Sequence, residues 1–93
     1  IIFNPHGEVF INSSGNPGMA KFGVGDVLTG VLAGLISQSD EVEKAIIASV
    51  YLHSLSADLL VKELTLYGIT AAKLMGNMPN AIKFIQETFI PEA

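Results

Sequence analysis

The chain has 93 residues, which is enough for one small domain with a single core. Its nine acidic and five basic side chains give a formal net charge of −4, and cations this few and scattered exclude a nucleic-acid-binding surface. The absence of cysteine excludes disulfides and thiolate zinc sites, and it fits a cytoplasmic protein.

The composition is strongly apolar, with 49% hydrophobic and 15% charged residues, whereas a typical soluble domain carries about 25% charged residues. A membrane span needs about 20 apolar residues, and the longest candidate run, 27–36, is interrupted by Thr29, Gly30 and Gly34. We therefore expect no membrane segment and infer burial against partner subunits or other parts of a larger domain. Because residues 1–3 open inside a strand-like run, we expect a segment truncated at its N-terminus.

The first part of the chain predicts a β-hairpin. Two short runs, Ile1–Asn4 and Glu8–Asn12, are rich in β-branched and aromatic residues and are separated by the turn sequence Pro-His-Gly. The following segment, Asn16–Met19, has proline and then glycine at its central positions. This order predicts a type II turn with a positive φ angle at Gly18.

A first helix is predicted over residues 25–37, with Gly30 and Gly34 leaving a bare patch for close packing. A short helix is expected to be capped by Thr70 and to end at residue 75, and Pro79 is expected in the first turn of a final helix. Together with the long helix described next, the pattern predicts an α/β fold with a hairpin followed by about four helices.

The longest helix is expected from a cap at Ser39 to Leu64, because acidic residues crowd its start and apolar residues then recur on nearly all sides. Such a helix is typical of a buried centre. Ser54, Asp58 and Lys62 lie four residues apart and are predicted to form its one wet edge, with an ion pair between the last two.

The glycine-rich segment "FGVGD", residues 22–26, stands where the first helix begins. The first amides of a helix have no internal partner and carry partial positive charge, so glycines at 23 and 25 would let a phosphate approach them. Asp26 would then lie beside that phosphate as a general base for an attacking hydroxyl. An aspartate in a first turn is also a common helix stabiliser, and the local pattern leaves both interpretations open.

The motifs "GNPGMA", "GVGDVLTG", "AGL" and "YLH" occur in an order that resembles the NAD(P)H-hydrate dehydratase family. These nucleotide-dependent repair enzymes have a ribokinase-like fold. The resemblance extends over essentially the whole chain, and it implies that residues 1–93 form the C-terminal part of such a domain.

The family implies that hydrated NADH or NADPH is dehydrated at the expense of ADP or ATP, with Mg²⁺ held mainly through the nucleotide phosphates. The ring hydroxyl is phosphorylated and phosphate is then eliminated. By resemblance, Asp26 contacts the hydrate and acts as the base, while Gly25 contacts the nucleotide. Backbone amides of Gly23, Val24, Gly25 and Asp26 form the anion hole, and Asn16 and Gly18 lie beside the substrate.

The chain departs from the family at Lys21 and Phe22, where members usually carry Thr-Gly. Phe22 adds bulk beside the phosphate loop, and the Lys21 ammonium is expected either to help hold phosphate or to be solvated. We expect no metal site held by the protein itself. The remaining candidates are interpreted as a core histidine, a solvated histidine and packing residues, namely His53, His6 and the set Met19, Met75 and Met78.

Two alternatives to a dehydratase stay open. A ribokinase-like kinase acting on a vitamin or sugar alcohol would share the GxGD motif, and a non-enzymatic segment would only fold and self-associate. Missing sheet partners would leave an apolar face exposed, so we expect a homo-oligomer.

Overall fold

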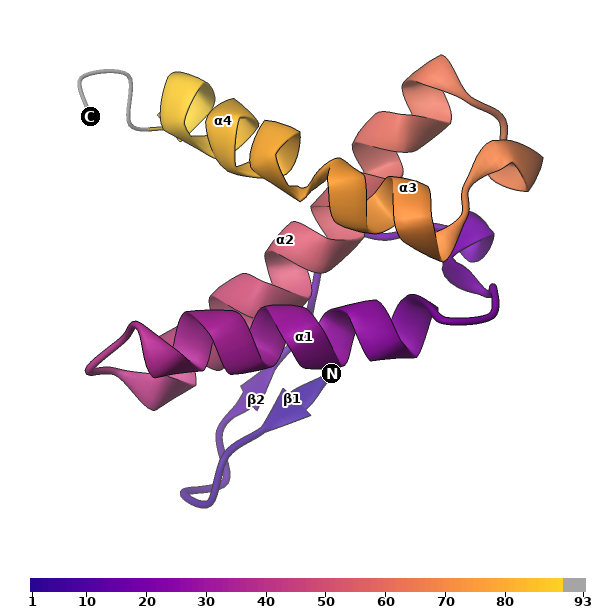
Figure 1. Ribbon diagram of the computed structural model, residues 1–93. Helices are drawn as coiled ribbons and strands as arrows, with labels where there is room; N and C mark the ends of the chain where they lie inside the picture. The colour runs from indigo at the N-terminus through magenta and orange to yellow at the C-terminus, as the bar shows by residue number, and fades with distance from the viewer. Residues whose placement is uncertain (90–93) are drawn as a thin grey trace.

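A computed structural model describes residues 1–89 as a short β-hairpin followed by four α-helices (Figure 1). This confirms the predicted α/β order of elements. The first helix begins one residue earlier than predicted and the hairpin strands are shorter. The elements are β1 Ile2–Phe3, β2 Val9–Phe10, the 3-10 turn η1 Pro17–Met19, α1 Val24–Ser37, α2 Val42–Glu63, the 3-10 turn η2 Leu66–Gly68, α3 Ala71–Gly76 and α4 Met78–Phe89.

The long helix α2 lies at the centre, as its apolar sequence predicts. It packs against α1 on one side and against α3 and α4 on another, and α1 crosses it in Figure 1. Apolar side chains of α2 are shared between two buried clusters, one with α1 and α3 and one with α4. The buried members are Val24, Ala57, Leu60, Ile69 and Leu74 in the first cluster and Leu52, Leu55 and Ala81 in the second.

Two hydrogen bonds at Ser56 connect α2 to the helices that follow it. The Ser56 hydroxyl donates to the carbonyl of Leu74 at 2.9 Å, and the Asn77 side chain donates to the carbonyl of Ser56 at 3.1 Å. Both bonds satisfy polar groups inside an apolar environment, where an unpaired group would be costly. They therefore fix the junction of α3 and α4 against the middle of α2.

The expectation that no segment is apolar and long enough to cross a membrane is wrong for α2. This helix has 22 residues, and an 18-residue window within it reaches a mean hydropathy of 1.3. In the structure 44% of that window is buried, and hydroxyl and imidazole groups of the helix bond to neighbouring elements. A core helix passes the same test of length and composition, and we interpret α2 as one.

The cap predicted at Ser39 is also wrong. The helix begins at Val42 with Glu41 as its N-cap residue, and no side chain caps it. Ser39 instead accepts a hydrogen bond from the amide of Glu41 at 3.0 Å, which stabilises the turn before the helix.

The structure also bears on the expectations about glycine, and it corrects the one for Gly18. Gly18 does not have a positive φ angle, because residues 17–19 form a single 3-10 turn whose cap is the Asn16 side chain. The bare patch predicted at Gly30 and Gly34 is present, since a methyl group added at either would meet no atom within 4 Å. No close helix packing uses them within the described part of the chain.

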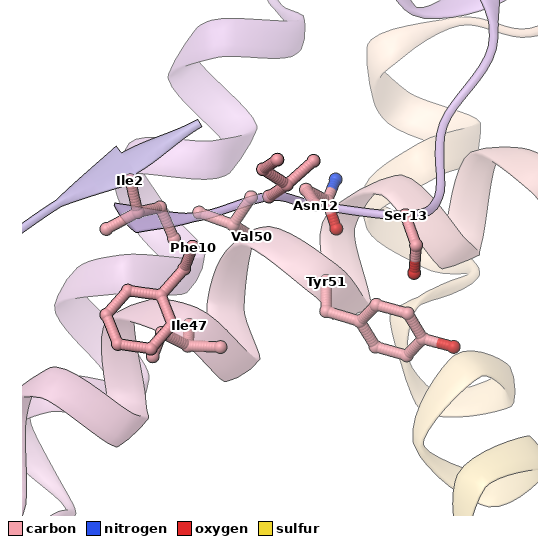
Figure 2. A pocket seen from close by; sticks show the side chains of 8 residues that line it. Ile2, Phe10, Asn12, Ser13, Ile47, Val50 and Tyr51 are labelled. Atoms are coloured by element: carbon pink, nitrogen blue, oxygen red, sulfur yellow. The ribbon is translucent and has the colours of Figure 1, made fainter. Parts of the chain in front are cut away.

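The hairpin packs on α2 through apolar side chains. Ile2 pairs with Phe10 across the two antiparallel strands, and both residues line a small pocket with Ile47 and Val50 of α2. Figure 2 shows the Phe10 ring beside Ile47, whereas the Tyr51 ring extends toward the other end of the pocket. The hairpin is therefore anchored by few contacts, and its outer face is open.

We expect Leu74→Ala to lower the free energy of unfolding by about 2–5 kcal/mol, because its side chain is fully buried and the substitution leaves a cavity. Ile11→Ala is the matched control, since Ile11 is 79% exposed, and its effect should stay within about 0.5 kcal/mol. Urea denaturation of the chain measures both. Equal effects of the two substitutions would contradict the described core.

Candidate functional site

The start of α1 presents unpaired backbone amides. Gly23 takes a left-handed conformation, with φ of 87°, and is the N-cap residue. The amide of Val24 donates to the carbonyl of Lys21 at 3.3 Å, and that of Val27 donates to Gly23 at 3.1 Å. Between them, the amides of Gly25 and Asp26 have no hydrogen-bond partner within residues 1–89. This is the geometry that binds an anion at a helix N-terminus.

The structure places different demands on the two loop glycines. At Gly23 a side chain would be strained by the positive φ angle, and its Cβ atom would lie 3.1 Å from the Cβ atom of Ala71. Gly25 is exposed, and a Cβ atom there would meet nothing within 4 Å. Neither packing nor backbone conformation within the described residues therefore requires glycine at position 25.

The Asp26 carboxylate lies in the first turn of α1 and is exposed. It makes no hydrogen bond or ion pair with any residue in the described range 1–89. It borders an apolar cleft of about 640 Å³ between α1 and the start of α4. Asp26 therefore combines a free carboxylate, two free amides nearby and an adjoining apolar surface lined by Val27, Gly30, Val31, Met75, Met78 and Pro79.

The prediction that all three methionines serve packing is only partly confirmed. Met19 and Met78 are partly buried against the two core clusters. Met75 is 60% exposed and lines the cleft beside Asp26.

His53 fixes the start of α1 to α2. The imidazole is buried, and its Nε2 atom lies 3.1 Å from the carbonyl oxygen of Val24. Because a carbonyl only accepts hydrogen bonds, Nε2 carries the proton and donates it. Burial lowers the pKa of His53 below 6.5, and the hydrogen bond to Val24 opposes this shift. The interpretation of His53 as a core histidine is confirmed, and His6 is exposed as expected.

The Asp58 carboxylate holds the "GNPG" segment in place. One oxygen accepts from the amide of Gly15 at 2.9 Å, and the other accepts from the Asn16 side chain at 2.8 Å. Asn16 in turn accepts from the amide of Gly18 at 2.9 Å. Asp58 is half-buried and its carboxylate is used by the loop, and its predicted ion pair with Lys62 is absent from the ion pairs of residues 1–89.

This geometry bears on the two residues expected beside the substrate. Both polar atoms of the Asn16 side chain are already used inside the protein. Gly18 is buried, and a Cβ atom there would lie 2.7 Å from the Cδ1 atom of Ile69. Substrate contact by Asn16 and Gly18 stays a prediction, and the structure places both in the support of the loop.

A second polar group lies next to the clamp that Asp58 forms with Gly15 and Asn16. Ser54, expected on the wet edge, is buried, and its hydroxyl accepts from the Asn12 side chain at 2.8 Å. The Ser14 hydroxyl also contacts the Ser54 hydroxyl. Sequence reasoning missed Ser54 and Asp58 as anchors because their partners lie about forty positions away in the chain.

The two departures from the family pattern behave differently from each other. Phe22 is fully exposed and packs on nothing within the described residues. The Lys21 ammonium is neither simply solvated nor free to hold phosphate, since it donates to the carbonyls of Leu66, Tyr67 and Ile69 at 3.1–3.3 Å.

No group of three or more His, Asp or Glu side chains gathers within the described residues to hold a metal ion.

The decisive comparison is with models of protein families. The family described as NAD(P)H-hydrate dehydratase matches residues 1–80. The chain belongs to the NAD(P)H-hydrate dehydratase family. The family resemblance predicted from the sequence motifs is therefore confirmed.

Relatives and a solved structure agree with this assignment. The chain is 39% identical over 89 residues to the bifunctional NAD(P)H-hydrate repair enzyme Nnr of Thermofilum pendens. It is 43% identical over 77 residues to the ADP-dependent (S)-NAD(P)H-hydrate dehydratase of Enterococcus faecalis. The structure of Bacillus subtilis YxkO, a member of the UPF0031 family, superposes with a TM-score of 0.83 at 32% identity over 86% of this chain.

The matched region is a minor part of each of these proteins. It covers 96% of this chain but 17% of the T. pendens protein, and 83% of this chain but 26% of the E. faecalis protein. It covers 30% of the YxkO chain. The chain therefore spans less than a third of the length of each of these proteins.

We expect stability to fall in mild acid because of His53. Its folded-state pKa is lowered, so below about pH 6.5 the unfolded chain takes up a proton that the folded chain does not. The contribution of neutral His53 to the free energy of unfolding is complete above about pH 6.5. It is lost as the pH falls through the lowered pKa of His53 in the folded chain. Thermal melting between about pH 7.5 and 5.5 measures it.

His53→Gln keeps a donor for the Val24 carbonyl but does not titrate, so it should flatten this pH dependence. His6→Gln is the control, because His6 is exposed and its replacement should leave the dependence unchanged. A steeper pH dependence of the melting temperature in His53→Gln would contradict the assignment of this dependence to His53.

A double-mutant cycle tests the Asp58 clamp. Asp58→Ala combined with Asn16→Ala should give an interaction energy of about 1–3 kcal/mol, because the two side chains share a charge-assisted hydrogen bond. The same cycle between Asp58 and Lys62 should give an interaction energy near zero. Denaturant unfolding measures both interaction energies. A larger interaction energy for Asp58 with Lys62 than for Asp58 with Asn16 would show that the carboxylate pairs with the lysine on the helix surface.

Proposed function

We propose that this chain supplies the phosphate-binding helix and the catalytic base of an ADP-dependent NAD(P)H-hydrate dehydratase. The observation that supports it is the free carboxylate of Asp26 in the same helical turn as the unpaired amides of Gly25 and Asp26. A relative named for ADP-dependent dehydration of NAD(P)H-hydrate aligns with this segment at 43% identity. The nucleotide proposed first is therefore ADP, with ATP as the alternative donor.

In the proposed reaction, the Asp26 carboxylate accepts the proton of the hydroxyl on the hydrated nicotinamide ring. The hydroxyl oxygen forms a bond to the terminal phosphorus of the nucleotide, and the bridging P–O bond breaks, so that ADP leaves as AMP. Elimination of phosphate from the ring then restores the double bond, with loss of a ring proton. The net change is removal of one water from the hydrate and hydrolysis of one phosphoryl bond.

Three local features support this assignment of roles. The amides of Gly25 and Asp26 would stabilise negative charge on the transferred phosphoryl group without having to reorganise. Gly23 permits the left-handed turn that opens the helix, and Val24 is held in place by its carbonyl and amide. The apolar cleft beside Asp26 offers a wall for a planar ring next to the reacting hydroxyl.

The proposal also covers the metal ion, the burial of the exposed apolar surface and the cellular location. Mg²⁺ would be bound mainly by the nucleotide phosphates, where it would neutralise charge on the leaving group. Large apolar side chains are exposed on the hairpin and at Phe22, which supports burial against further protein, either the rest of the domain or a second copy. A cytoplasmic location fits the metabolite named for the relatives.

We expect Asp26→Asn to lower turnover by about 10²–10⁴-fold while ADP binding persists, because the amide cannot accept the proton but keeps the shape of the carboxylate. The assay host is the E. faecalis dehydratase with its matched segment replaced by this chain, which supplies the rest of the domain. Recovery of NADH absorbance from NADH-hydrate and ADP measures turnover.

Asp40→Asn is the matched control, because Asp40 is an exposed acid outside the site and its replacement makes the same change of charge. Near-normal turnover with Asp26→Asn would overturn the role of this residue. A hybrid that phosphorylates small alcohols but leaves NADH-hydrate unchanged would instead identify a ribokinase-like kinase.

A further inference from the structure

The side chain of Lys21 bridges two loops that are far apart in the chain. Its ammonium donates to the carbonyl oxygens of Leu66 at 3.2 Å, Tyr67 at 3.3 Å and Ile69 at 3.1 Å. These carbonyls receive no backbone hydrogen bond within the described residues. An ammonium group has three N–H donors. The number of acceptor carbonyls in residues 66–69 therefore equals the number of donors on Lys21.

The main chain of Lys21 is connected to the start of α1. Its amide donates to the carbonyl of Met19 at 2.9 Å, and its carbonyl accepts from the amide of Val24 at 3.3 Å. The Val24 amide is therefore occupied, whereas the amides of Gly23, Gly25 and Asp26 have no hydrogen-bond partner within residues 1–89. The main chain of Lys21 therefore fixes the amide that stands between the free donors of the candidate anion site.

We propose that Lys21 is a positioning residue of the anion-binding loop, tying the turn 66–69 to the residues that precede α1. This rests on the proposed function, because the loop matters for catalysis only if it binds the nucleotide phosphate. Lys21 does not touch the phosphate in this role. Its ammonium supplies hydrogen-bond donors to three carbonyls that have no backbone partner within the described residues. It thereby holds Gly23 against the Cβ atom of Ala71, where a side chain at position 23 would lie 3.1 Å away.

A second lysine provides a natural comparison at the same turn. Lys73 of α3 donates to the carbonyl of Gly68 at 3.4 Å but makes no hydrogen bond to residues 20–26. Loss of Lys73 removes the same charge from the same turn without releasing the loop before α1. The pair Lys21→Met and Lys73→Met thus separates positioning of the loop from stabilisation of the turn.

The first measurement uses the chain itself. Amide hydrogen exchange at Val24, whose amide is bonded to Lys21, should become about tenfold faster in Lys21→Met and stay unchanged in Lys73→Met. Unchanged exchange at Val24 in Lys21→Met would overturn the proposal, whether or not the chain has any activity.

The second measurement is chemical rescue. Lys21→Ala removes the equivalent of propylammonium, so adding propylammonium should recover pyrophosphate binding that the substitution weakens by about tenfold. Tetramethylammonium at equal ionic strength is the control, because it carries the same charge but no N–H donor. Equal effects of the two ions would show a role of charge alone and would overturn the proposed anchor.

The third measurement uses the hybrid dehydratase described above. Lys21→Met should raise KM for ADP and lower kcat, each by about tenfold, with little change in the melting temperature. An active wild-type hybrid that tolerates Lys21→Met would refute the positioning role and leave the proposed function intact. An inactive wild-type hybrid would refute the proposed function, and hydrogen exchange at Val24 would still decide the role of Lys21.

Discussion

The hydrogen bond between His53 and the carbonyl of Val24 joins the middle of α2 to the first residue of α1. Two further side chains of α2 act in the same way, since Asp58 holds the segment at Gly15 and Ser56 holds the end of α3. All three belong to one turn and a half of a helix whose apolar residues form both core clusters. The candidate site thus depends on α2 as its rigid support.

This arrangement separates support from chemistry. The groups that face the candidate phosphate position are backbone amides and one exposed carboxylate, whereas the side chains that hold them are buried or occupied by internal hydrogen bonds. Such a division would suit the proposed phosphoryl transfer, which depends on positioning and on electrostatic stabilisation more than on covalent chemistry by the protein. It also explains why Asn16, with both polar atoms used, serves the loop that it stabilises.

Much of the fold could be predicted because its signals are local. The hairpin, the Thr70 cap and the first-turn position of Pro79 follow from residues within a few positions of one another, and the structure confirms each. The long apolar run similarly predicts a buried helix. The predictions that fail, such as the Asp58–Lys62 ion pair, used the nearest complementary residue on a helix surface, whereas tertiary packing supplied a stronger partner from a distant loop.

The sequence by itself determined the family, the order of the elements and the glycine-flanked helix start with Asp26, because these are encoded by contiguous motifs. Only the tertiary structure decided the uses of Asp58, Ser54 and Lys21. Their hydrogen-bond partners lie about forty or more positions away, and a carboxylate, hydroxyl or ammonium pairs with whichever donor or acceptor the fold brings within 3 Å or so. The spacing of residues along the chain therefore does not predict these hydrogen-bond partners.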